Sequence, residues 1–342
     1  MPRPSSLLLA AALLPLLPMT SRPAFSGDPV ATFSIVAYDP ETGDLGVAVE
    51  SRFFAVGSVV PWAKAGVGAI ATQSFANTTF GPKGLQLLGN GLPAQETLDV
   101  LVKGDPQSGQ RQVGIVDARG RPATWTGAKC NPWAGGKTGK NYTVQGNILT
   151  GKEVVEAMAS TFEATAGLPL ADRLVKALAA GQAAGGDSRG QQSAALLVVR
   201  DKGGYAGYND RYIDLRVDDS PRPIEELQRL LDLHHITNAY TDARFYMDKG
   251  DRERGVEIME EATRRRVSGD VVKDAEKGEA FYDLACFYSL AKMKEPALAN
   301  LEKAFRLNAT LIAYSLNDAD LDPLREDARY KALVKDAAAP KK

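Results

Sequence analysis

Few side chains in this sequence can carry metal, redox or acid–base chemistry. Its 342 residues include two His, His234 and His235, and two Cys, Cys130 and Cys286. Neither Cys has a second Cys within metal-ligand spacing, and adjacent His side chains on a helix point about 100° apart. These features argue against zinc modules, CxxC redox motifs, haem attachment and a Ser-His-Asp triad. We therefore expect no metal and no cofactor, a His pair that faces solvent, and two free thiols.

Hydroxyl and carboxylate side chains remain as candidates, and they gather in an early hairpin. The segment TFSIVAY begins with the hydroxyl residue Thr32, and the segment LGVAVES ends in Glu50-Ser51 and is followed by Arg52. Turn residues between the two segments predict a β-hairpin. Thr32 is either a nucleophile or a β-branched residue that simply starts a strand.

Two Gly-rich segments raise the question of a site for an anion. GGKTGK (135–140) ends like a phosphate loop but lacks the spacing of one, so we expect no nucleotide there. AAGGDSRGQQS (183–193) carries Gly186, Asp187 and Ser193 just before a strand. Such a segment can aim backbone N–H groups and a carboxylate into a cleft. It equally fits an ordinary connection from a helix to a strand, with Gly capping the helix.

Hydrophobic periodicity predicts strands in pairs, with helices in blocks between them. The expected hairpins are 32–38 with 45–51, 112–117 with 122–127, and 194–200 with 212–218, and a further strand is expected at 67–73. The expected helices cover 82–88, 94–102, 152–163 and 170–180. Strand pairs outnumber βαβ units, which predicts an α+β fold with antiparallel sheets covered by helices.

The first 26 residues have the pattern of a secretory signal. Arg3 precedes the apolar run 7–17, and the small-residue stretch 24–26 follows it. The run is too short to span a bilayer. We therefore expect residues 1–26 to be a signal peptide, with export to the periplasm or the medium and no membrane span.

A second region of different composition begins near Pro221 and Pro223. Beyond this boundary the sequence becomes helical, and seven residue pairs of matching type recur at an offset of 42 positions, from Tyr240 with Tyr282 to Ala262 with Ala304. Small residues followed by large apolar ones are typical of tetratricopeptide-type helical hairpins, and the extra length is interpreted as a charged loop at 264–277. The expected domains are 32–220 and 221–342, folding separately.

The overall charge limits the partners that the chain can bind. Lys and Arg number 41 against 42 Asp and Glu, a net charge of −1. No general field draws the protein onto phosphate backbones, so nucleic acid is not an expected partner.

The first hairpin resembles that of the N-terminal nucleophile hydrolases, in particular proteasome β-type subunits. In those subunits an N-terminal Thr lies opposite an Ala-x-Asp-Ser-Arg stretch, and here the matching residues are Thr32 and AVESR (48–52). Glu50 replaces the Asp, and Thr32 is not at the encoded N-terminus. The chain is more closely similar, from about Thr32 to His235, to the domain of unknown function 1028 family. The segments VPWAKAGVGAIATQSF, RQVGIVDARG, WTGAKCNPWAG and AGGDSRGQQSAALLV carry this resemblance.

This resemblance implies a four-layer αββα sandwich and amide hydrolysis by Thr32. An N-terminal Thr holds its nucleophilic hydroxyl and a basic α-amine in one residue, so no His is needed. Glu50 and Arg52 would orient the terminus, and Lys64 would hold the amine neutral by like-charge repulsion. Backbone N–H groups around Gly186 would bind the oxyanion, supported by Asp187 and Ser193.

The mechanism requires that Thr32 become the N-terminus. Cleavage after Ser26 leaves residues 27–31 ahead of Thr32, so either signal peptidase cuts after Ala31 or the Thr32 hydroxyl cleaves the bond that precedes it. The expected substrate is then a small peptide or amide, and related enzymes imply a homo-oligomer.

The alternative is a non-catalytic binding or scaffold protein of the cell envelope. Some members of the resembling family carry a segment described as peptidoglycan-binding after the same boundary, here 221–246. Residues 221–342 would then bind a protein or peptidoglycan partner.

Overall fold

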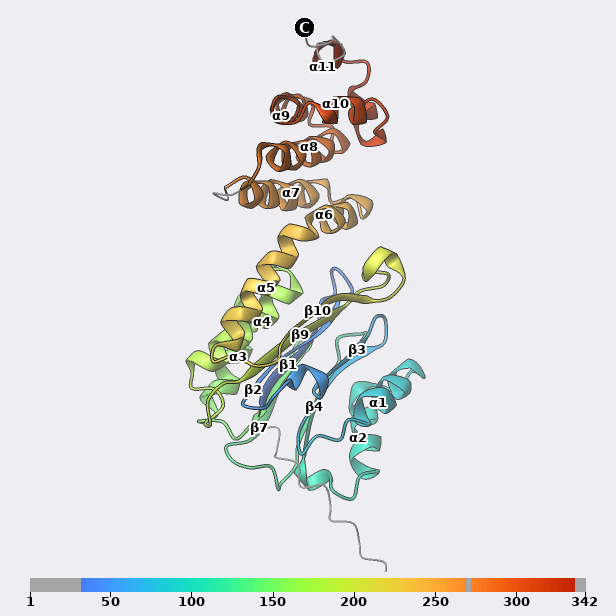
Figure 1. Ribbon diagram of the computed structural model, residues 1–342. Helices are drawn as coiled ribbons and strands as arrows, with labels where there is room; N and C mark the ends of the chain where they lie inside the picture. The colour runs from blue at the N-terminus through green and yellow to red at the C-terminus, as the bar shows by residue number, and fades with distance from the viewer. Residues whose placement is uncertain (1–31, 269–271, 336–342) are drawn as a thin grey trace, which may run out of the picture.

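The chain is a mixed α+β structure with antiparallel sheets, followed by a region built of helices (Figure 1). The computed structural model describes residues 32–268 and 272–335. The expected signal peptide at 1–26 lies outside the described residues. Within the described ranges, no helix combines the length and the apolar character that crossing a membrane requires.

The larger sheet has six strands in the order β10-β9-β2-β1-β8-β7, and all of its neighbouring strands pair antiparallel. Its strands are β1 (Thr32–Tyr38), β2 (Leu45–Ser51), β7 (Gly135–Gly139), β8 (Tyr142–Asn147), β9 (Ser193–Val199) and β10 (Arg211–Val217). The smaller sheet has the order β3-β4-β5-β6, also antiparallel. Its strands are β3 (Pro61–Lys64), β4 (Gly68–Ser74), β5 (Arg111–Asp117) and β6 (Pro122–Thr126).

Alternation along β1 decides which side chains face which layer, because successive side chains on a strand point to opposite faces. Phe33 and Ile35 join the core beneath the helices of the larger sheet. Val36 joins a separate core that contains residues of both sheets, including Val47 and Ala69. The two sheets therefore pack face to face, and every second residue of β1 points between them.

Helices cover the outer face of each sheet. The core of the larger sheet includes residues of α3 (Glu153–Ala164), α4 (Leu170–Ala183) and α5 (Pro223–Thr237). The core of the smaller sheet includes residues of α1 (Phe80–Gly89) and α2 (Ala94–Lys103). α5 begins with Pro at its first turn, where the missing N–H costs no hydrogen bond.

The C-terminal helices form a column that extends away from the sheets (Figure 1). They are α6 (Ala239–Asp248), α7 (Arg252–Val267), α8 (Asp274–Leu290), α9 (Lys294–Leu307), α10 (Thr310–Ser315) and α11 (Ala328–Lys335). One apolar core runs through them and contains both members of the repeated pair Ala262 and Ala304. The sequence offset of 42 relates α7 to α9.

Two expectations from the sequence need correction. The charged stretch expected as a loop at 264–277 is mostly helical, because α7 continues to Val267 and α8 begins at Asp274. The His pair, expected to face solvent, is only partly exposed. His235 is half-buried against Asp172 of α4, and burial lowers the pKa of His234 to about 4.

Strands β3, β7 and β8 were not expected, and β7 is the Gly-rich segment of 135–140. α5, which the sequence placed with the C-terminal region, packs Ile224, Leu227 and Leu231 into the core of the larger sheet. Cys130 and Cys286 are both free, as expected; both were also expected to be buried, which holds for Cys286, whereas Cys130 is only partly buried.

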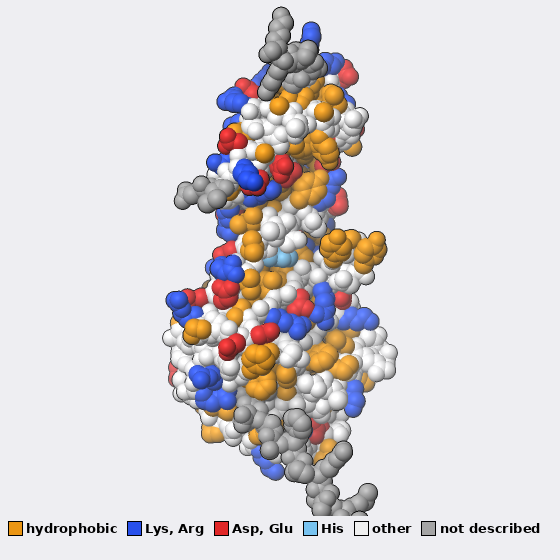
Figure 2. All heavy atoms as spheres, viewed as in Figure 1, with side chains coloured by type: hydrophobic (Ala, Val, Ile, Leu, Met, Phe, Trp, Pro, Cys, Tyr) orange, Lys and Arg blue, Asp and Glu red, His pale blue; other side chains and the backbone are white. Residues whose placement is uncertain are grey.

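Apolar side chains also protrude from the β9–β10 loop. Tyr205 and Tyr208 are 88% and 87% exposed there. The space-filling view shows an apolar projection at its right edge, where Figure 1 draws the β9–β10 loop (Figure 2).

Candidate functional site

A row of polar residues crosses four neighbouring strands at one end of the larger sheet. Ser193 pairs with Ser51, Ser51 with Thr32, and Thr32 with Asn147. All four side chains are completely buried. The Thr32 hydroxyl donates to Ser51 Oγ over 3.1 Å. Directly opposed residues on paired strands lie close together on one face, so the row forms a continuous polar line.

Thr32 faces the space between the two sheets. Ser34, two residues along the same strand, donates to Gln73 Oε1 of β4 at 2.6 Å. Gln73 Nε2 in turn donates to the backbone carbonyl of Thr32 at 3.3 Å. A hydroxyl side chain at the start of β1 is thus held against the smaller sheet.

Amide side chains fill the space beside this row. Gln73 Nε2 and Asn147 Nδ2 both donate to Gln112 Oε1, at 2.8 and 3.0 Å. Gln145 Nε2 donates to Ser34 Oγ at 2.6 Å. These four residues, Gln73, Gln112, Gln145 and Asn147, form an amide cluster. Its buried acceptor Asn147 Oδ1 has no hydrogen-bond donor among the described residues.

The amide cluster depends on a glycine in the facing strand. A Cβ added at Gly114 of β5 would lie 2.1 Å from Gln145 Oε1, well inside van der Waals contact. Gly114 is buried at this crossing point. A side chain at this position would require the Gln145 amide to move from its present hydrogen bonds.

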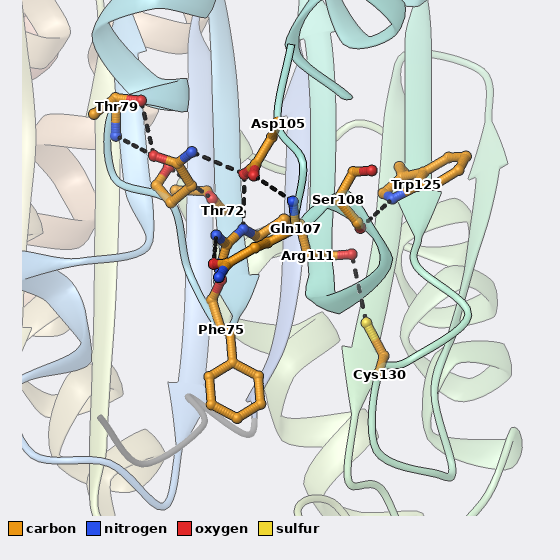
Figure 3. A network of polar contacts seen from close by, with 10 residues as sticks. Thr72, Phe75, Thr79, Asp105, Gln107, Ser108, Arg111, Trp125 and Cys130 are labelled. Carbon is orange, nitrogen blue, oxygen red and sulfur yellow. Dashed lines mark hydrogen bonds and ion pairs between the residues drawn. The ribbon is translucent and has the colours of Figure 1, made fainter. Parts of the chain in front are cut away.

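A second polar network fixes the loops at this end of the smaller sheet (Figure 3). Arg111, which precedes Gln112, donates through Nε to Asp105 at 2.8 Å. Asn77 donates to the same carboxylate at 2.9 Å. Despite partial burial, these hydrogen bonds lower the pKa of Asp105. The loops that follow β4 and precede β5 are tied together, which positions Gln73 and Gln112.

Glu50 lies on the opposite face of the sheet from Thr32. It pairs with Phe33, which belongs to the core beneath the helices. The Glu50 side chain is completely buried, and neither carboxylate oxygen has a hydrogen-bond partner among the described residues. Burial, and then the neighbouring Asp187 charge, raise the pKa of Glu50 well above its ordinary value, although Arg189 opposes this. Burial without a hydrogen-bond donor therefore favours the neutral form of this carboxyl group.

Asp187 organises the loop that joins α4 to β9. Its carboxylate accepts hydrogen bonds from the Arg52 backbone N–H at 3.0 Å and from the Arg189 backbone N–H at 2.9 Å. It also pairs with the Arg189 guanidinium at 3.0 Å. The Asp187 side chain is completely buried in this arrangement. Asp187 thereby holds the chain just after β2 against the Gly-rich segment.

The remaining candidate residues from the sequence, Gly186, Ser193 and Lys64, lie in three different environments. The N–H of Gly186, at φ +58°, donates to the carbonyl of Gly181 and so caps α4. Ser193 donates to the Phe53 carbonyl at 2.5 Å and accepts from the Val56 N–H. Lys64 is exposed at the far end of β3, where it pairs with Gly68.

The structure therefore brings Thr32, Arg52, Asp187 and Ser193 to one end of the larger sheet and leaves Lys64 away from them. Gly68 and Gln73 are five residues apart on β4, a separation of roughly 17 Å along a strand. Gln73, Gln112, Gln145 and Asn147 were missed from the sequence. The available signal was a polar residue at an inward position of an otherwise apolar strand.

Three side chains of the types that can bind metals lie close together in the described helical region. Cys286, Asp318 and Asp320 place one ligand atom each within 4.8 Å of one another. The hydroxyl of Tyr282 already donates to Asp318 at 2.8 Å, and that of Tyr240 to Asp320 at 2.9 Å. The carboxylates of Asp318 and Asp320 therefore already accept hydrogen bonds from tyrosines of the neighbouring helices.

The fold and the site together define an α+β protein that holds a buried polar cluster between two antiparallel sheets. The model of the family of unknown function DUF1028 matches residues 32–227, which is more than half of the chain. The chain belongs to this family.

A solved structure supports this assignment. The crystal structure of a protein from Silicibacter pomeroyi, described as a member of the same family, has 31% sequence identity and a TM-score of 0.54. The match covers 59% of this chain and 88% of that chain. No curated protein matches the sequence.

Proposed function

We propose that this protein is an exported amide hydrolase of the N-terminal nucleophile class, with Thr32 as its nucleophile. The proposal rests first on the position of Thr32 at the start of β1, with its hydroxyl turned into the space between the sheets. The order of helices, sheet, sheet and helices in the first domain supports an αββα sandwich of that class.

The neighbours of Thr32 suit a residue that acts as both nucleophile and base. Once Thr32 is the N-terminus, its α-amine accepts the proton of the attacking hydroxyl. Ser51 Oγ, 3.1 Å away, keeps the hydroxyl in place. Oδ1 of Asn147, which has no donor among the described residues and lies on the strand paired with β1, offers an acceptor for an amine N–H. A neutral amide acceptor orients the amine without adding a charge that would raise its pKa.

The residues around Thr32 take supporting roles that differ from those expected from the sequence. Arg52 and Asp187 position the loop after β2, and Gly186 shapes the turn that presents Asp187. Ser193 holds the 53–56 turn next to Ser51. Glu50 is buried on the opposite face of the sheet from Thr32. Lys64 has no part in the chemistry at Thr32.

We propose an interaction role for the C-terminal helical region. The hairpins α6–α7 and α8–α9 repeat at the sequence offset and support a tetratricopeptide-like interaction domain. Its partner in the cell envelope would be a protein or the peptidoglycan. Retention of the full chain on insoluble peptidoglycan tests the second of these, and free passage through the matrix removes it.

Covalent labelling tests the nucleophile. A β-lactone probe reacts with an N-terminal Thr when Oγ bonds to the lactone carbonyl carbon and the ring C–O bond breaks. The Thr proton passes through the amine to the released alkoxide, so the protein gains the whole mass of the probe. Protein from its native compartment should carry one adduct on Thr32. Thr32→Ala should carry none, and Ser51→Ala should react more slowly.

The matched control is Thr310→Ala, an exposed hydroxyl in the helical region, which should react like the wild type. A mature wild-type chain that begins at Thr32 and takes no label would contradict the proposed chemistry.

A further inference from the structure

A cavity of about 400 Å³ lies where the sheets meet the first C-terminal helices. Its walls come from the β1–β2 loop, the start of α4, the ends of β9 and β10, and helices α5 to α7. Asp44 borders this cavity, immediately before β2, whereas Ser51 ends the same strand beside Thr32. Along a strand, the separation between Asp44 and Ser51 is roughly 23 Å. The cavity is therefore separate from the Thr32 site and from the function proposed for it.

A buried arginine lines the cavity and is held in one orientation. Arg200 is 8% exposed and donates through Nε and Nη2 to the two carboxylate oxygens of Asp44, both at 2.7 Å. Its guanidinium also packs on the rings of Tyr212 at 3.9 Å and Phe245 at 4.0 Å. Tyr212 belongs to β10 and Phe245 to α6, so both the sheet domain and the helical region fix the position of this cation.

The other terminal nitrogen of Arg200 is left to bind a ligand. Among the described residues, nothing accepts a hydrogen bond from Nη1. Nη1 also keeps accessible surface, unlike the sealed and unpartnered Nε of Arg173. Hydrogen bonds of a guanidinium lie in its plane and match the two oxygens of a carboxylate. Because Arg200 lines the cavity, its Nη1 can donate to an acceptor that enters there.

The aspartates around the cavity already have hydrogen-bond partners. Asp172 of α4 contacts His235 Nε2 at 3.1 Å. Asp242 of α6 is hydrogen-bonded to Tyr212, and its Oδ1 is sealed from solvent. Together with Asp44, these acids therefore offer little to a cationic ligand.

The outer wall on α7 carries two ion pairs that are complete in themselves. Arg254 pairs with Glu257 at 3.0 Å, and Arg265 pairs with Glu261 at 2.7 Å. Lys176 of α4 also lines the cavity, and it has no ion pair within the described part of the chain. The cavity thus has donors to spare, and these suit an anionic ligand.

The rest of the lining is largely apolar. Leu168 precedes α4, Ile236 lies on α5, and Ile258 comes from α7. Apolar walls with a few fixed polar groups suit a ligand that has a hydrocarbon body and one charged end. A carboxylate carries a single negative charge, which one unpaired lysine can balance, whereas a phosphate monoester carries nearly two.

We propose that this cavity binds a small organic carboxylate. The carboxylate accepts from Arg200 Nη1, its charge is balanced by Lys176, and its hydrocarbon body packs against Ile236 and Ile258. Since Arg200 follows β9 and packs on Phe245 of α6, the bound carboxylate lies beside the contact that joins the sheet domain to the helical region.

Isothermal titration calorimetry on the full chain tests this with phenylacetate, its neutral analogue phenylacetamide and the cation phenethylamine. The titration is run at about pH 6, where the probe carboxylate is ionised. Burial raises the pKa of Asp242 to about 6, against the effects of Tyr212 and Arg200, so at this pH Asp242 repels an anion less than a fully ionised acid would. Phenylacetate should bind with 1:1 stoichiometry and at least about tenfold more tightly than either other probe.

Three variants test the residues that the proposal names. Arg200→Lys keeps a cation beside Asp44 but removes Nη1, and it should weaken phenylacetate binding by at least about tenfold. Lys176→Gln changes an exposed side chain and should weaken binding by about threefold. Ile258→Phe fills the cavity without changing charge and should abolish binding.

Lys103→Gln is the matched control, because Lys103 is also an exposed helical lysine but lies on α2, outside the cavity. It should bind phenylacetate like the wild type. Melting curves establish that each variant is folded. No phenylacetate binding up to about 10 mM, equal affinity for phenylacetamide, or unchanged binding in a folded Arg200→Lys protein would overturn the proposal. If Arg200→Lys does not fold, unchanged phenylacetate binding in Lys176→Gln overturns it.

Discussion

Thr32 and Glu50 lie at the same end of two paired strands but point to opposite faces of the sheet. The register pairs Thr32 with Ser51, while Glu50 pairs with Phe33. Ser51, rather than the acid beside it, therefore shares the buried space of the Thr32 hydroxyl. Thr32 and Glu50 can be separated by mutation, because they act through different layers of the fold.

Replacing Glu50 with Gln tests the state of that buried acid. The pKa of Glu50 in the folded protein is raised well above its ordinary value, by burial first and by Asp187 next. The unfolded chain loses this proton at lower pH than the folded chain does, so wild-type stability falls as pH rises from about 4.5 toward the raised pKa. The free energy of unfolding of Glu50→Gln should rise relative to the wild type over that range. Urea titrations at several pH values measure it, and a constant difference would show that Glu50 is not perturbed.

The contact between His235 and Asp172 should make stability depend on pH with the same sign, but in a higher pH range. Burial alone would lower the pKa of His235, but the Asp172 carboxylate at 3.1 Å outweighs it and raises the pKa. A raised pKa of His stabilises the fold below the unfolded value of about 6.5 and loses this effect as pH rises through the folded value. Asp172→Asn should therefore reduce the melting temperature more at about pH 6 than at about pH 8.5. An equal reduction at both pH values would mean that the contact carries no charge effect.

Gly114→Ala should disrupt the amide cluster between the sheets. The added methyl would lie 2.1 Å from Gln145 Oε1, and such overpacking costs about 1 to 3 kcal/mol of stability. Gly89→Ala is a suitable control, because its methyl would meet only Val67 at an ordinary 3.8 Å. Chemical denaturation of both variants gives the comparison. A Gly114→Ala protein as stable as the control would show that Gln145 has room to move.

Helix α5 should decide whether the first domain folds alone. Ile224, Leu227 and Leu231 fill the core of the larger sheet, and each buried side chain of this size contributes about 1.5 to 3 kcal/mol. A fragment of residues 32–237 should unfold cooperatively, whereas residues 32–220 should be several kcal/mol less stable or bind hydrophobic dyes. Equal stability of the two fragments would show that α5 does not stabilise the first domain.

The hairpins could be predicted from the sequence because alternating apolar residues and turn residues act locally. β8 was missed because Gln145 and Asn147 interrupt its apolar pattern, and these polar side chains make sense only when the facing sheet supplies Gln112 and Gln73. The Gly-rich strand β7 lacks side chains that would signal a strand.

The candidate site could be predicted only in part, for the same reason. Thr32 stood out as a hydroxyl at the start of a strand, and the Asp187 loop stood out by composition. The face on which each side chain lies depends on register, which set Ser51 beside Thr32 and turned Glu50 away. The separation of Lys64 from Thr32 depends on how β3 pairs with β4, and no local pattern encodes that pairing.

The N-terminus of the mature protein tests the central claim most directly. Intact mass and N-terminal sequencing of the protein isolated from its native compartment would identify the first residue. We expect a chain that begins at Thr32, with a free α-amine next to its own hydroxyl. We also expect that Thr32→Ala keeps the fold, and that its residues 27–31 are retained if the Thr32 hydroxyl makes the final cleavage. A fully mature chain that begins at Gly27 would leave Thr32 without its base and would contradict the proposed hydrolase.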